Sequence, residues 1–462
     1  MSDLFDDLMR RLEDAQPPMA KAADYYAGRQ PLAYLDPEVA SALSGRLAPV
    51  VVGWPRLVCN AVEERLDVDG FRLAAGDPAD ADLWRIWQSN NLDEASQQAH
   101  LEALIGGRCY VIVWAGPDPS TPRITVESAA QVITVRDPAT REVTAALKRW
   151  HADGYGHATL FLPSEVRRYR TRNQGSTAYG DLPYLPASST GWEQTGTLPN
   201  PLDVVPVVPV VNRPRLLNLD GESELVEVMP LADAVNKLAT DMLVSAEYHA
   251  APRRWITGMG DGMGQAAMDR TALVVQQRWE NARASKLWIA GEPDTKFGQF
   301  PEADLSNFIN AIGMFTQQLA ALTGLPPHYL GLSTDNPASA DAIRSAESSL
   351  VAKARRRQKA FGGAWEDVMR LAVQVRDGQP AQGLDALETI WRDPETRTTA
   401  QAADAAVKLV AAGIIPPAQA QEDLGYTPVQ IERMAADRLT ADPGTRQPRL
   451  VLDRPDPMVA TS

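Results

Sequence analysis

Residues 305–338 read LSNFINAIGMFTQQLAALTGLPPHYLGLSTDNPA, and this stretch decides the fold. Its first half carries apolar residues at helical spacing, which predicts a helix with an apolar face wide enough to contact more than one neighbour. The face consists of Leu305, Phe308, Ile309, Ile312, Phe315, Leu319 and Leu322. Glycine commonly follows the last residue of a helix, as Gly324 does here. Pro326–Pro327 cannot donate the backbone hydrogen bonds that a continuing helix needs. The helix therefore ends at a short, proline-rich loop.

A second helix precedes this one and a third follows it. Upstream, apolar residues recur at alternating three- and four-residue steps, a narrow seam of the kind that packs helix on helix; they are Val228, Leu231, Val235, Leu238 and Met242. Downstream, Asn336 is placed as an N-cap and Pro337 as the first helical residue, and no proline follows before Arg376. We therefore predict a long helix to about Arg376, kinked at Gly362–Gly363 because a glycine pair is a recognised cause of kinks.

Five segments, taken in their order and spacing, carry a resemblance over more than a third of the chain. They are Val207–Arg213, Gly221–Leu225, Asp233–Lys237, Leu325–Gly331 and the helix from Ser339 through Trp365. Each is weak alone. Together they resemble the portal proteins of tailed bacteriophages, in particular the subgroup typified by the portal of a Bacillus siphophage. The resemblance implies a structural protein that forms a dodecameric ring at one capsid vertex, through which double-stranded DNA is packaged and later ejected.

The resemblance also implies an α+β portal fold and an order of regions. The regions are an α+β wing with antiparallel strands at 1–220, a first stem helix at 221–250, a small clip at 251–301, a second stem helix at 302–324, a tunnel loop at 325–338, a long kinked helix returning to the wing at 339–377, an α-helical crown at 378–440 and a disordered tail at 441–462. Within the crown, glycines and prolines delimit three short helices, at 399–412 and opening at Pro416–Pro417 and Thr427–Pro428.

Apolar runs separated by turn residues predict the elements of the N-terminal region. A short amphipathic helix is expected at 4–12 and a longer helix near 80–105, and strand-like runs follow at 109–113, 124–126, 132–135, 143–150, 158–162 and 166–171. Asp137–Pro138 and Asp153–Gly154 mark turns between these runs, so we predict an antiparallel meander. Residues 173–200 are rich in Gly, Ser, Thr and Pro and predict an exposed loop.

The two stem helices have more apolar surface than one hairpin can bury, so we predict that they pack laterally between subunits. The residues expected in this packing are Leu231, Val235, Leu238, Met242, Phe308, Ile312, Phe315 and Leu319. Trp255, Trp279 and Trp288 stand in an otherwise polar clip, and tryptophan is enriched at protein interfaces. By the resemblance, the head-tail adaptor and the terminase large subunit dock there; a small local core is the alternative for at least one of the three.

By the resemblance, the tunnel loop is the segment nearest the DNA. Its polar residues are His328, Tyr329, Ser333, Thr334, Asp335 and Asn336. Asp335 is the only formally charged residue among them, so the expected contacts with DNA are transient.

The most cationic stretch of the chain lies on the long helix and has two candidate roles, contact with DNA and ionic contact between subunits. Its residues are Lys353, Arg355, Arg356, Arg357 and Lys359, with Arg344 further upstream. Because these charges fall around much of the helix circumference, some must be solvated or paired with acidic residues such as Glu347 or Glu366. Ion pairs within or between subunits are favoured over phosphate contacts.

Composition limits the function classes. The 462 residues carry a formal net charge of −14. Tight duplex binding needs lysines and arginines that neutralise phosphates, so an acidic chain fits a channel wall along which DNA slides. Cys59 and Cys109, with no signal peptide, indicate a reducing compartment, and the absence of a long apolar run predicts no membrane role. The resemblance implies assembly in the host cytoplasm, location in the virion, and major capsid and scaffolding proteins as further partners.

Three patterns suggest enzymatic chemistry, and each is weak. Gly221–Leu225 begins like a nucleophile elbow but lacks the second glycine, and Ser223 is interpreted as a helix N-cap. Gly258–Gly264 lacks the lysine of a phosphate-binding loop, and His151 and His157 have no third metal ligand nearby. We therefore expect no catalytic residue, cofactor or metal. Two alternatives stay open: another capsid-associated structural protein, with these helices but no closed ring, and a nucleic-acid-processing enzyme, which would need clustered carboxylates.

Overall fold

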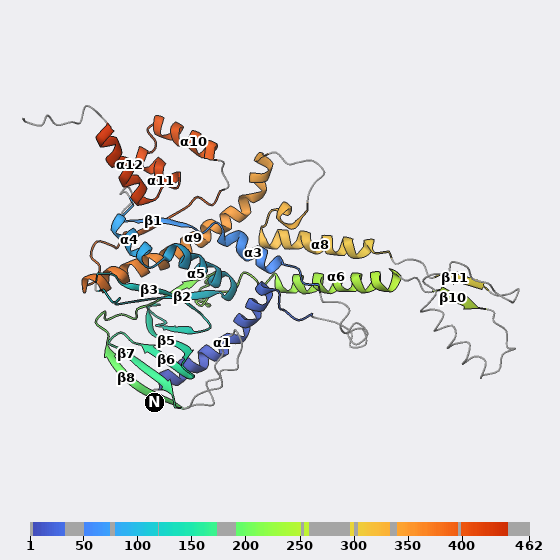
Figure 1. Ribbon diagram of the computed structural model, residues 1–462, viewed down its shortest axis with the longest axis horizontal. Coiled ribbons are helices and arrows are strands. Elements are labelled where there is room, and N and C mark those ends of the chain that lie inside the picture. The colour runs from blue at the N-terminus through green and yellow to red at the C-terminus, as the bar shows by residue number, and fades with distance from the viewer. Residues whose placement is uncertain are drawn as a thin grey trace, which may run out of the picture. The chain divides into compact units, whose positions relative to one another are not determined.

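The computed structural model describes residues 3–32, 50–73, 79–118, 120–172, 191–250, 254–257, 296–299, 304–332, 340–395 and 399–441 (Figure 1). These residues form α-helices and antiparallel sheets, which confirms the predicted α+β class. The chain divides into two compact units, one of Met1–Pro31, Val52–Ala232 and Gln317–Ser462 and the other of Leu32–Val51 and Asp233–Thr316. Among the described residues, no helix has the length and apolar character that crossing a membrane requires.

Two antiparallel sheets organise the first unit. The larger is a meander of β4 (Val132–Arg136), β5 (Val143–Ala152), β6 (Tyr155–Phe161), β7 (Glu165–Thr171) and β8 (Trp192–Pro199). The smaller has the order β3 (Arg123–Ser128), β2 (Arg108–Trp114) and β9 (Val207–Val211). The six predicted strand-like runs are confirmed as β2 to β7. The exposed loop predicted at 173–200 is wrong for its last part, because β8 pairs with β7.

Side chains of β2 alternate between two cores, as the two-residue period of a strand requires. Cys109, Val111 and Val113 are buried in the core that includes α3 (Trp54–Glu63), α5 (Leu92–Gly106) and α9 (Ala340–Asp377). Tyr110 and Ile112 enter a second core, shared with the larger sheet. The other face of the larger sheet packs on the first half of α1 (Asp3–Ala27). This unit is therefore layered as helices, smaller sheet, larger sheet and α1.

Three predictions about helical segments need correction. The helix expected at 4–12 continues through Pro17–Pro18 as α1. The single helix expected near 80–105 is two, α4 (Ala81–Ser89) and α5, because Asn91 between them adopts a positive φ of 52°. The purely helical crown is wrong at β12 (Glu388–Trp391), which pairs with β1 (Val68–Arg72). After it come three helices where glycine and proline predict them, α10 (Thr399–Ala411), α11 (Pro417–Asp423) and α12 (Pro428–Ala441).

The long helix α9 changes direction along its length in Figure 1, but Gly362–Gly363 does not interrupt it. Gly362 has a packing role instead. A Cβ at this position would lie 3.1 Å from Nε1 of Trp391, and the Thr389 hydroxyl donates to the Gly362 carbonyl at 3.1 Å. The glycine therefore allows β12 to pack closely against α9.

The second unit contains most of two long helices, and each is described by itself. They are α6 (Met229–Ala250) and α8 (Ser306–Thr323), and β10 (Arg254–Thr257) pairs with β11 (Lys296–Gln299) between them in the sequence. α8 falls within the helix predicted at 302–324. α6 begins at Met229 and not at Gly221. Ser223 is not its N-cap, because the Ser223 hydroxyl accepts a hydrogen bond from the Leu225 N–H at 3.0 Å within a run of turns.

Candidate functional site

Two segments, one before α6 and one after α8, dock on α9. After α8, the short 3-10 helix η2 (Pro327–Leu330) brings Tyr329 against Glu347. Before α6, residues 221–228 bring Glu224 against Lys353 and Arg357. α9 therefore holds both segments by hydrogen bonds and ion pairs, and the basic run supplies two of the cations.

Tyr329 is held by two charged side chains. Nη2 of Arg65 donates to the Tyr329 hydroxyl at 2.9 Å, and the hydroxyl donates to Oε1 of Glu347 at 3.4 Å. Glu347 is only 6% exposed, and Arg65 Nη2 lies 3.9 Å from its Oε1. The half-buried Tyr329 ring packs against the main core. The phenol of Tyr329, one of the polar residues predicted for the tunnel loop, therefore anchors the start of that segment on Arg65 and Glu347.

His328 lies at the edge of this cluster. Its side chain is 42% exposed, and Nε2 lies 4.0 Å from Oε1 of Glu347. Of the six polar residues predicted for the tunnel loop, the structure describes only His328 and Tyr329, and His328 is the more accessible. The other four, Ser333, Thr334, Asp335 and Asn336, lie outside the described residues.

Two glycines bracket η2 and give a matched pair of variants. Gly324 and Gly331 adopt positive φ angles of 69° and 73°. A Cβ on Gly324 would lie 2.5 Å from Oγ of Ser349 in α9, whereas a Cβ on Gly331 meets nothing within 4 Å. We expect G331A to cost about 1 kcal/mol for the left-handed backbone, and G324A about 2–4 kcal/mol because the Ser349 side chain must also move. Thermal denaturation measures both; equal losses would contradict close packing of the loop on α9.

Glu224 is the buried counter-charge of the basic run. It is 4% exposed, Lys353 Nζ lies 3.4 Å from its Oε2, and Arg357 Nε donates to its Oε1 at 3.0 Å. Burial alone would raise the pKa of Glu224, but the positive charges of Lys353 and Arg357 outweigh this effect and hold the pKa below its ordinary value. The carboxylate is therefore ionised at neutral pH and neutralises basic residues that would otherwise face one another.

Removal of this carboxylate is expected to be costly and pH-dependent. E224A leaves Lys353 and Arg357 without their shared counter-charge, so we expect a loss of about 3–5 kcal/mol at pH 7. Because the pKa of Glu224 is lower in the folded state, its ionised carboxylate stabilises the fold at pH values above the unfolded pKa of 4.5. This stabilisation is lost as the pH falls through the folded pKa. Thermal denaturation should therefore show the variant approaching the parent at acid pH; a gap independent of pH would contradict this. The matched control E388A removes an exposed pair with Arg72 and should cost less than about 1 kcal/mol.

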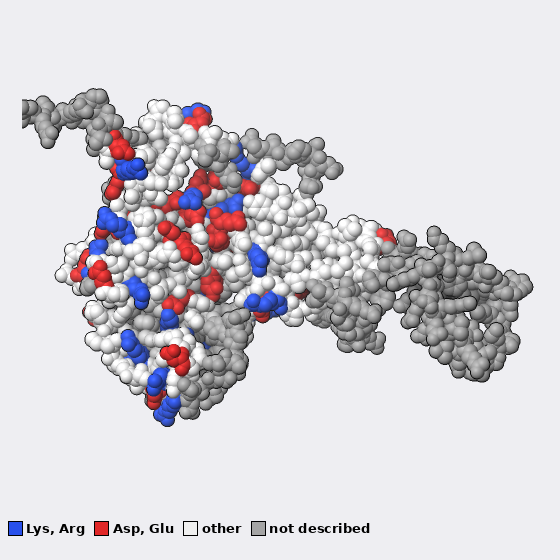
Figure 2. Space-filling model, in the orientation of Figure 1, with Lys and Arg blue, Asp and Glu red and all other residues white. Residues whose placement is uncertain are grey.

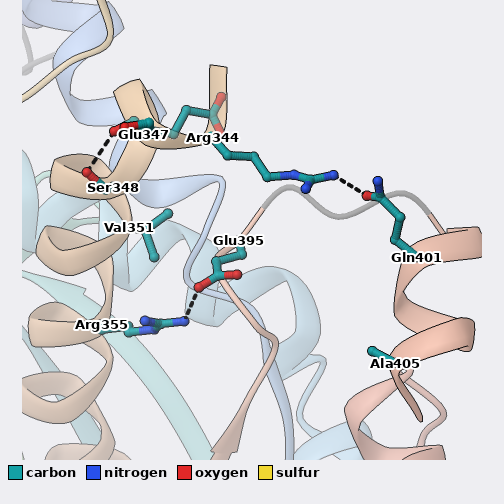
Figure 3. A pocket seen from close by; sticks show the side chains of 9 residues that line it. Arg344, Glu347, Ser348, Val351, Arg355, Glu395, Gln401 and Ala405 are labelled. Atoms are coloured by element: carbon teal, nitrogen blue, oxygen red, sulfur yellow. Dashed lines mark hydrogen bonds and ion pairs between the residues drawn. The ribbon is translucent and has the colours of Figure 1, made fainter. Parts of the chain in front are cut away.

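Arg355 of the basic run and the upstream Arg344 line a pocket between α9 and α10 (Figure 3). Arg355 Nη2 lies 2.7 Å from Oε1 of Glu395, and Arg344 donates to the side chain of Gln401. These four residues help to line the pocket, which has a volume of about 520 Å³. The structure therefore shows contacts of these arginines with other parts of the same chain.

Glu347 and Glu366, the two acidic residues named from the sequence as examples of partners for this run, lie beside other cations. Glu347 contacts Arg65 and Tyr329, and Oε2 of Glu366 lies 3.7 Å from Arg370. The run pairs instead with Glu224, Asp393 and Glu395. Arg356 and Lys359 are exposed on α9. These two are therefore the members of the run most accessible to a phosphate or a neighbouring subunit.

The helices α6 and α8 keep apolar surface in solvent. α8 carries no charged residue, and Figure 2 shows an uncharged surface over it. Of the predicted packing residues, Val235 and Leu319 are buried in the single chain, and the half-buried ones are Leu231, Leu238, Met242, Phe308, Ile312 and Phe315. Ile309 is 62% exposed and Leu322 is 54% exposed. The single chain therefore leaves part of this apolar face uncovered.

Of the three tryptophans predicted for the clip interface, only Trp255 lies among the described residues. Trp255 lies in β10, which pairs with β11 in an antiparallel register. Trp279, Trp288 and the glycine-rich segment 258–264 lie outside the described residues. The roles of the three tryptophans therefore remain predictions.

His151 and His157 do not face each other across their strands. The register of β5 and β6 places His157 opposite Trp150 and not opposite His151. Within the described ranges, no group of three or more His, Cys, Asp or Glu side chains could hold a metal ion. His100 is fully buried, its Nε2 accepts from Nε1 of Trp365 at 2.8 Å, and burial lowers its pKa to about 3. His100 is therefore a neutral core residue.

Two residues of the site were not found from the sequence. Glu224 lies in the segment Gly221–Leu225. The one feature of the sequence that could have pointed to it is its position directly before the apolar pair Leu225–Val226. Arg65 has no local signal, because 264 residues separate it from Tyr329.

Comparison with known proteins identifies the family of this chain. The sequence model of the family described as "Phage portal protein, SPP1 Gp6-like" matches residues 12–430. The portal protein of Mycobacterium phage D29 is 35% identical over 451 residues, covering 93% of this chain and 87% of the relative. The portal protein of Mycobacterium phage L5 is 35% identical over 453 residues, covering 93% and 86%.

Two solved structures are similar at low sequence identity. The virion of a native gene transfer agent particle contains a chain that is 14% identical, with a TM-score of 0.44, over 89% of this chain and 99% of that one. The neck of an empty gene transfer agent particle gives 14% identity and a TM-score of 0.46 over the same shares. Because the family model spans most of the sequence, this chain belongs to the SPP1 Gp6-like family of phage portal proteins.

Proposed function

We propose that this chain forms a dodecameric ring at one vertex of the capsid, and that the ring is the channel for packaging and ejection of double-stranded DNA. The observation that supports the ring is the apolar surface of α6 and α8 that the single chain leaves open, including Ile309 and Leu322. Exposed apolar surface of this kind marks an interaction site. A closed ring covers the same surface in every copy.

The proposal gives each region a place. Residues 1–220 form the wing, α6 and α8 the stem, 251–301 the clip, 325–338 the tunnel loop, and 378–440 a crown that contains β12 as well as helices. The clip, with Trp255, Trp279 and Trp288, docks the head-tail adaptor and the terminase large subunit. Major capsid and scaffolding proteins surround the ring, which assembles in the host cytoplasm and stays at the portal vertex of the virion.

The charge distribution suits a wall along which DNA slides. From Leu305 to Thr334 the sequence has no charged residue. Lys353 and Arg357 are already paired with the buried Glu224. These two cations are therefore not free to hold phosphates, and tight duplex binding depends on free cations.

Isolated rings are therefore expected to bind linear duplex DNA weakly. At about 0.15 M salt the Debye length is about 8 Å, and the remaining attraction of exposed residues such as Arg356 and Lys359 should be screened. Fluorescence anisotropy with a labelled duplex, measured against salt concentration, checks this expectation. Tight, sequence-selective binding that resists salt would indicate a regulatory DNA-binding protein.

Sedimentation of the purified full-length protein tests the proposed ring. Twelve chains of 50.3 kDa give a particle of about 600 kDa. A protein that sediments only at the mass of one chain would contradict the ring. Nuclease and ATPase assays on the same sample address the enzymatic alternative, and we expect no activity in either.

A further inference from the structure

The turn that follows β9 places two leucines in solvent. Leu216 is 79% exposed and Leu217 is fully exposed. The turn is closed by backbone hydrogen bonds, from the Arg215 N–H to the Asn218 carbonyl at 2.8 Å and from the Asn218 N–H to the Arg215 carbonyl at 2.9 Å. We call residues 215–218 the leucine turn. Its apolar tip would be stabilised by a covering partner.

The base of the leucine turn is fixed by a buried asparagine. Asn212 is fully buried, and its Nδ2 donates to the Glu222 carbonyl at 2.8 Å. Backbone hydrogen bonds of 2.9 Å join Asn212 to Gly107 and to Glu222. Gly221 has a φ of 77°, and a side chain there would collide with the Asn212 and Gly107 carbonyls. A turn held in this way is pre-organised, so little conformational freedom is lost when its tip is buried.

A groove in the same unit matches the leucine turn in chemistry. It has a volume of about 570 Å³ and is lined by residues of β2 and β3 and of β5 to β8. Trp114, Trp150 and Phe161 line it together with Leu198, which is 40% exposed. We call it the aromatic groove. Charged residues also line the groove, namely Arg123, Glu127, Lys148 and Arg168, and Lys148 is paired with Glu127. The apolar and aromatic part of the lining is the part that can accept leucine side chains.

The leucine turn and the aromatic groove lie at opposite corners of the smaller sheet. The order β3, β2, β9 puts β3 and β9 at opposite edges. Along the strands, the turn follows Val211, which pairs with Arg108. The groove reaches Trp114 and Arg123 at the other end of β2 and extends along β3 to Glu127, opposite Tyr110. The seven residues of β2 span about 20 Å at a rise of 3.2–3.4 Å per residue. A head-to-tail ring needs two different complementary patches on opposite sides of one subunit.

We propose that the leucine turn of one copy seats in the aromatic groove of the next copy around the ring. The occupant is a second copy of this chain, because the chain carries both the apolar tip and an apolar groove, placed as a head-to-tail contact requires. The inference rests on the proposed ring. It adds a second pair of surfaces that joins neighbouring subunits, apart from α6 and α8.

Cysteine cross-linking tests this contact on the full-length protein. The double variant L217C/L198C places one new thiol on the turn and one at the groove, while the native Cys59 and Cys109 are fully buried and do not compete. A short bismaleimide applied to rings should give a ladder of covalent multimers that ends at the ring mass on a denaturing gel. Each single variant, L217C or L198C, should remain at the mass of one chain.

The outcomes separate this inference from the proposed ring. If the parent protein forms no rings, the proposed ring and the proposed contact between the leucine turn and the aromatic groove are both contradicted. Intact rings of L217C/L198C that give no ladder overturn the contact and leave the ring standing. Covalent dimers from L217C alone also overturn it, because they would show that two leucine turns meet each other.

A second pair of variants measures the energy of the contact. L216S/L217S should raise the concentration at which rings half-dissociate by at least about tenfold, since the covered apolar area is lost. The control V407S changes another exposed apolar residue, Val407 of α10, which is 68% exposed. Its half-dissociation concentration should stay within about twofold of the parent. An equal response of the two variants overturns the proposed contact.

Discussion

Replacing Ile312 with aspartate is expected to abolish ring formation while the single chain stays folded. Ile312 is half-buried in the single chain, on a helix that has no charged residue. In the proposed ring, a neighbouring copy covers the rest of this face. The new carboxylate would then be buried without a partner, which costs more than the roughly 2–7 kcal/mol of an unpaired neutral polar group, and it recurs in every copy. Velocity sedimentation should show only the 50.3 kDa chain.

Matched variants separate packing from a general effect of charge. N310D places a carboxylate at an exposed polar position of the same helix and should form rings like the parent. L238D makes the equivalent test in α6, where Leu238 is half-buried. Circular dichroism shows whether each variant is folded. Rings of normal mass from folded I312D or L238D would show that these helices do not pack between subunits.

Shortening the tunnel loop is expected to lower DNA packaging and to leave assembly intact. Deletion of Ser333–Asp335 removes no residue of the described cores and leaves Tyr329 on Arg65 and Glu347. The anchored start of the loop should therefore keep its place on α9, while the segment proposed to face the DNA no longer reaches it. We expect normal procapsids that contain much less DNA than those of the parent. Nuclease-protected DNA per particle measures this.

The control for the loop keeps its length. S333A/T334A removes two hydroxyl groups without shortening the chain and should package nearly as much DNA as the parent. Normal packaging by the shortened protein would show that the loop is a passive linker. Failure of the shortened protein to assemble would show that the segment belongs to the subunit core.

Sequence reasoning located the elements that have strong local signals. α8 and the helices α10 to α12 are bounded by glycine and proline, and β2 to β7 by turn residues such as Asp153–Gly154. β12 has no such signal. It is four residues long and exists as a strand because it pairs with β1, more than three hundred residues away. β8 was missed for a similar reason, since its composition is that of a loop and pairing with β7 makes it a strand.

The candidate site was less predictable, because its contacts join distant parts of the chain. The basic run was visible in the sequence, but its main counter-charge, Glu224, lies 129 residues from Lys353 and 133 residues from Arg357. Tyr329 was named from the sequence, and it lies in η2 after α8. Its anchoring role depends on Arg65, which only the folded chain brings near.

Electron cryomicroscopy of the full-length ring, with its loops traced, tests the central claim most directly. The claim is that this chain builds a closed ring in which residues 325–338 of each copy line the narrowest part of a central DNA channel. We expect a ring with an open centre, α8 packed against neighbouring copies, Tyr329 on Arg65 and Glu347, and the loop beyond Gly331 directed inward. A particle without a central opening, or a ring whose 325–338 segments lie on its outer rim, would contradict the account.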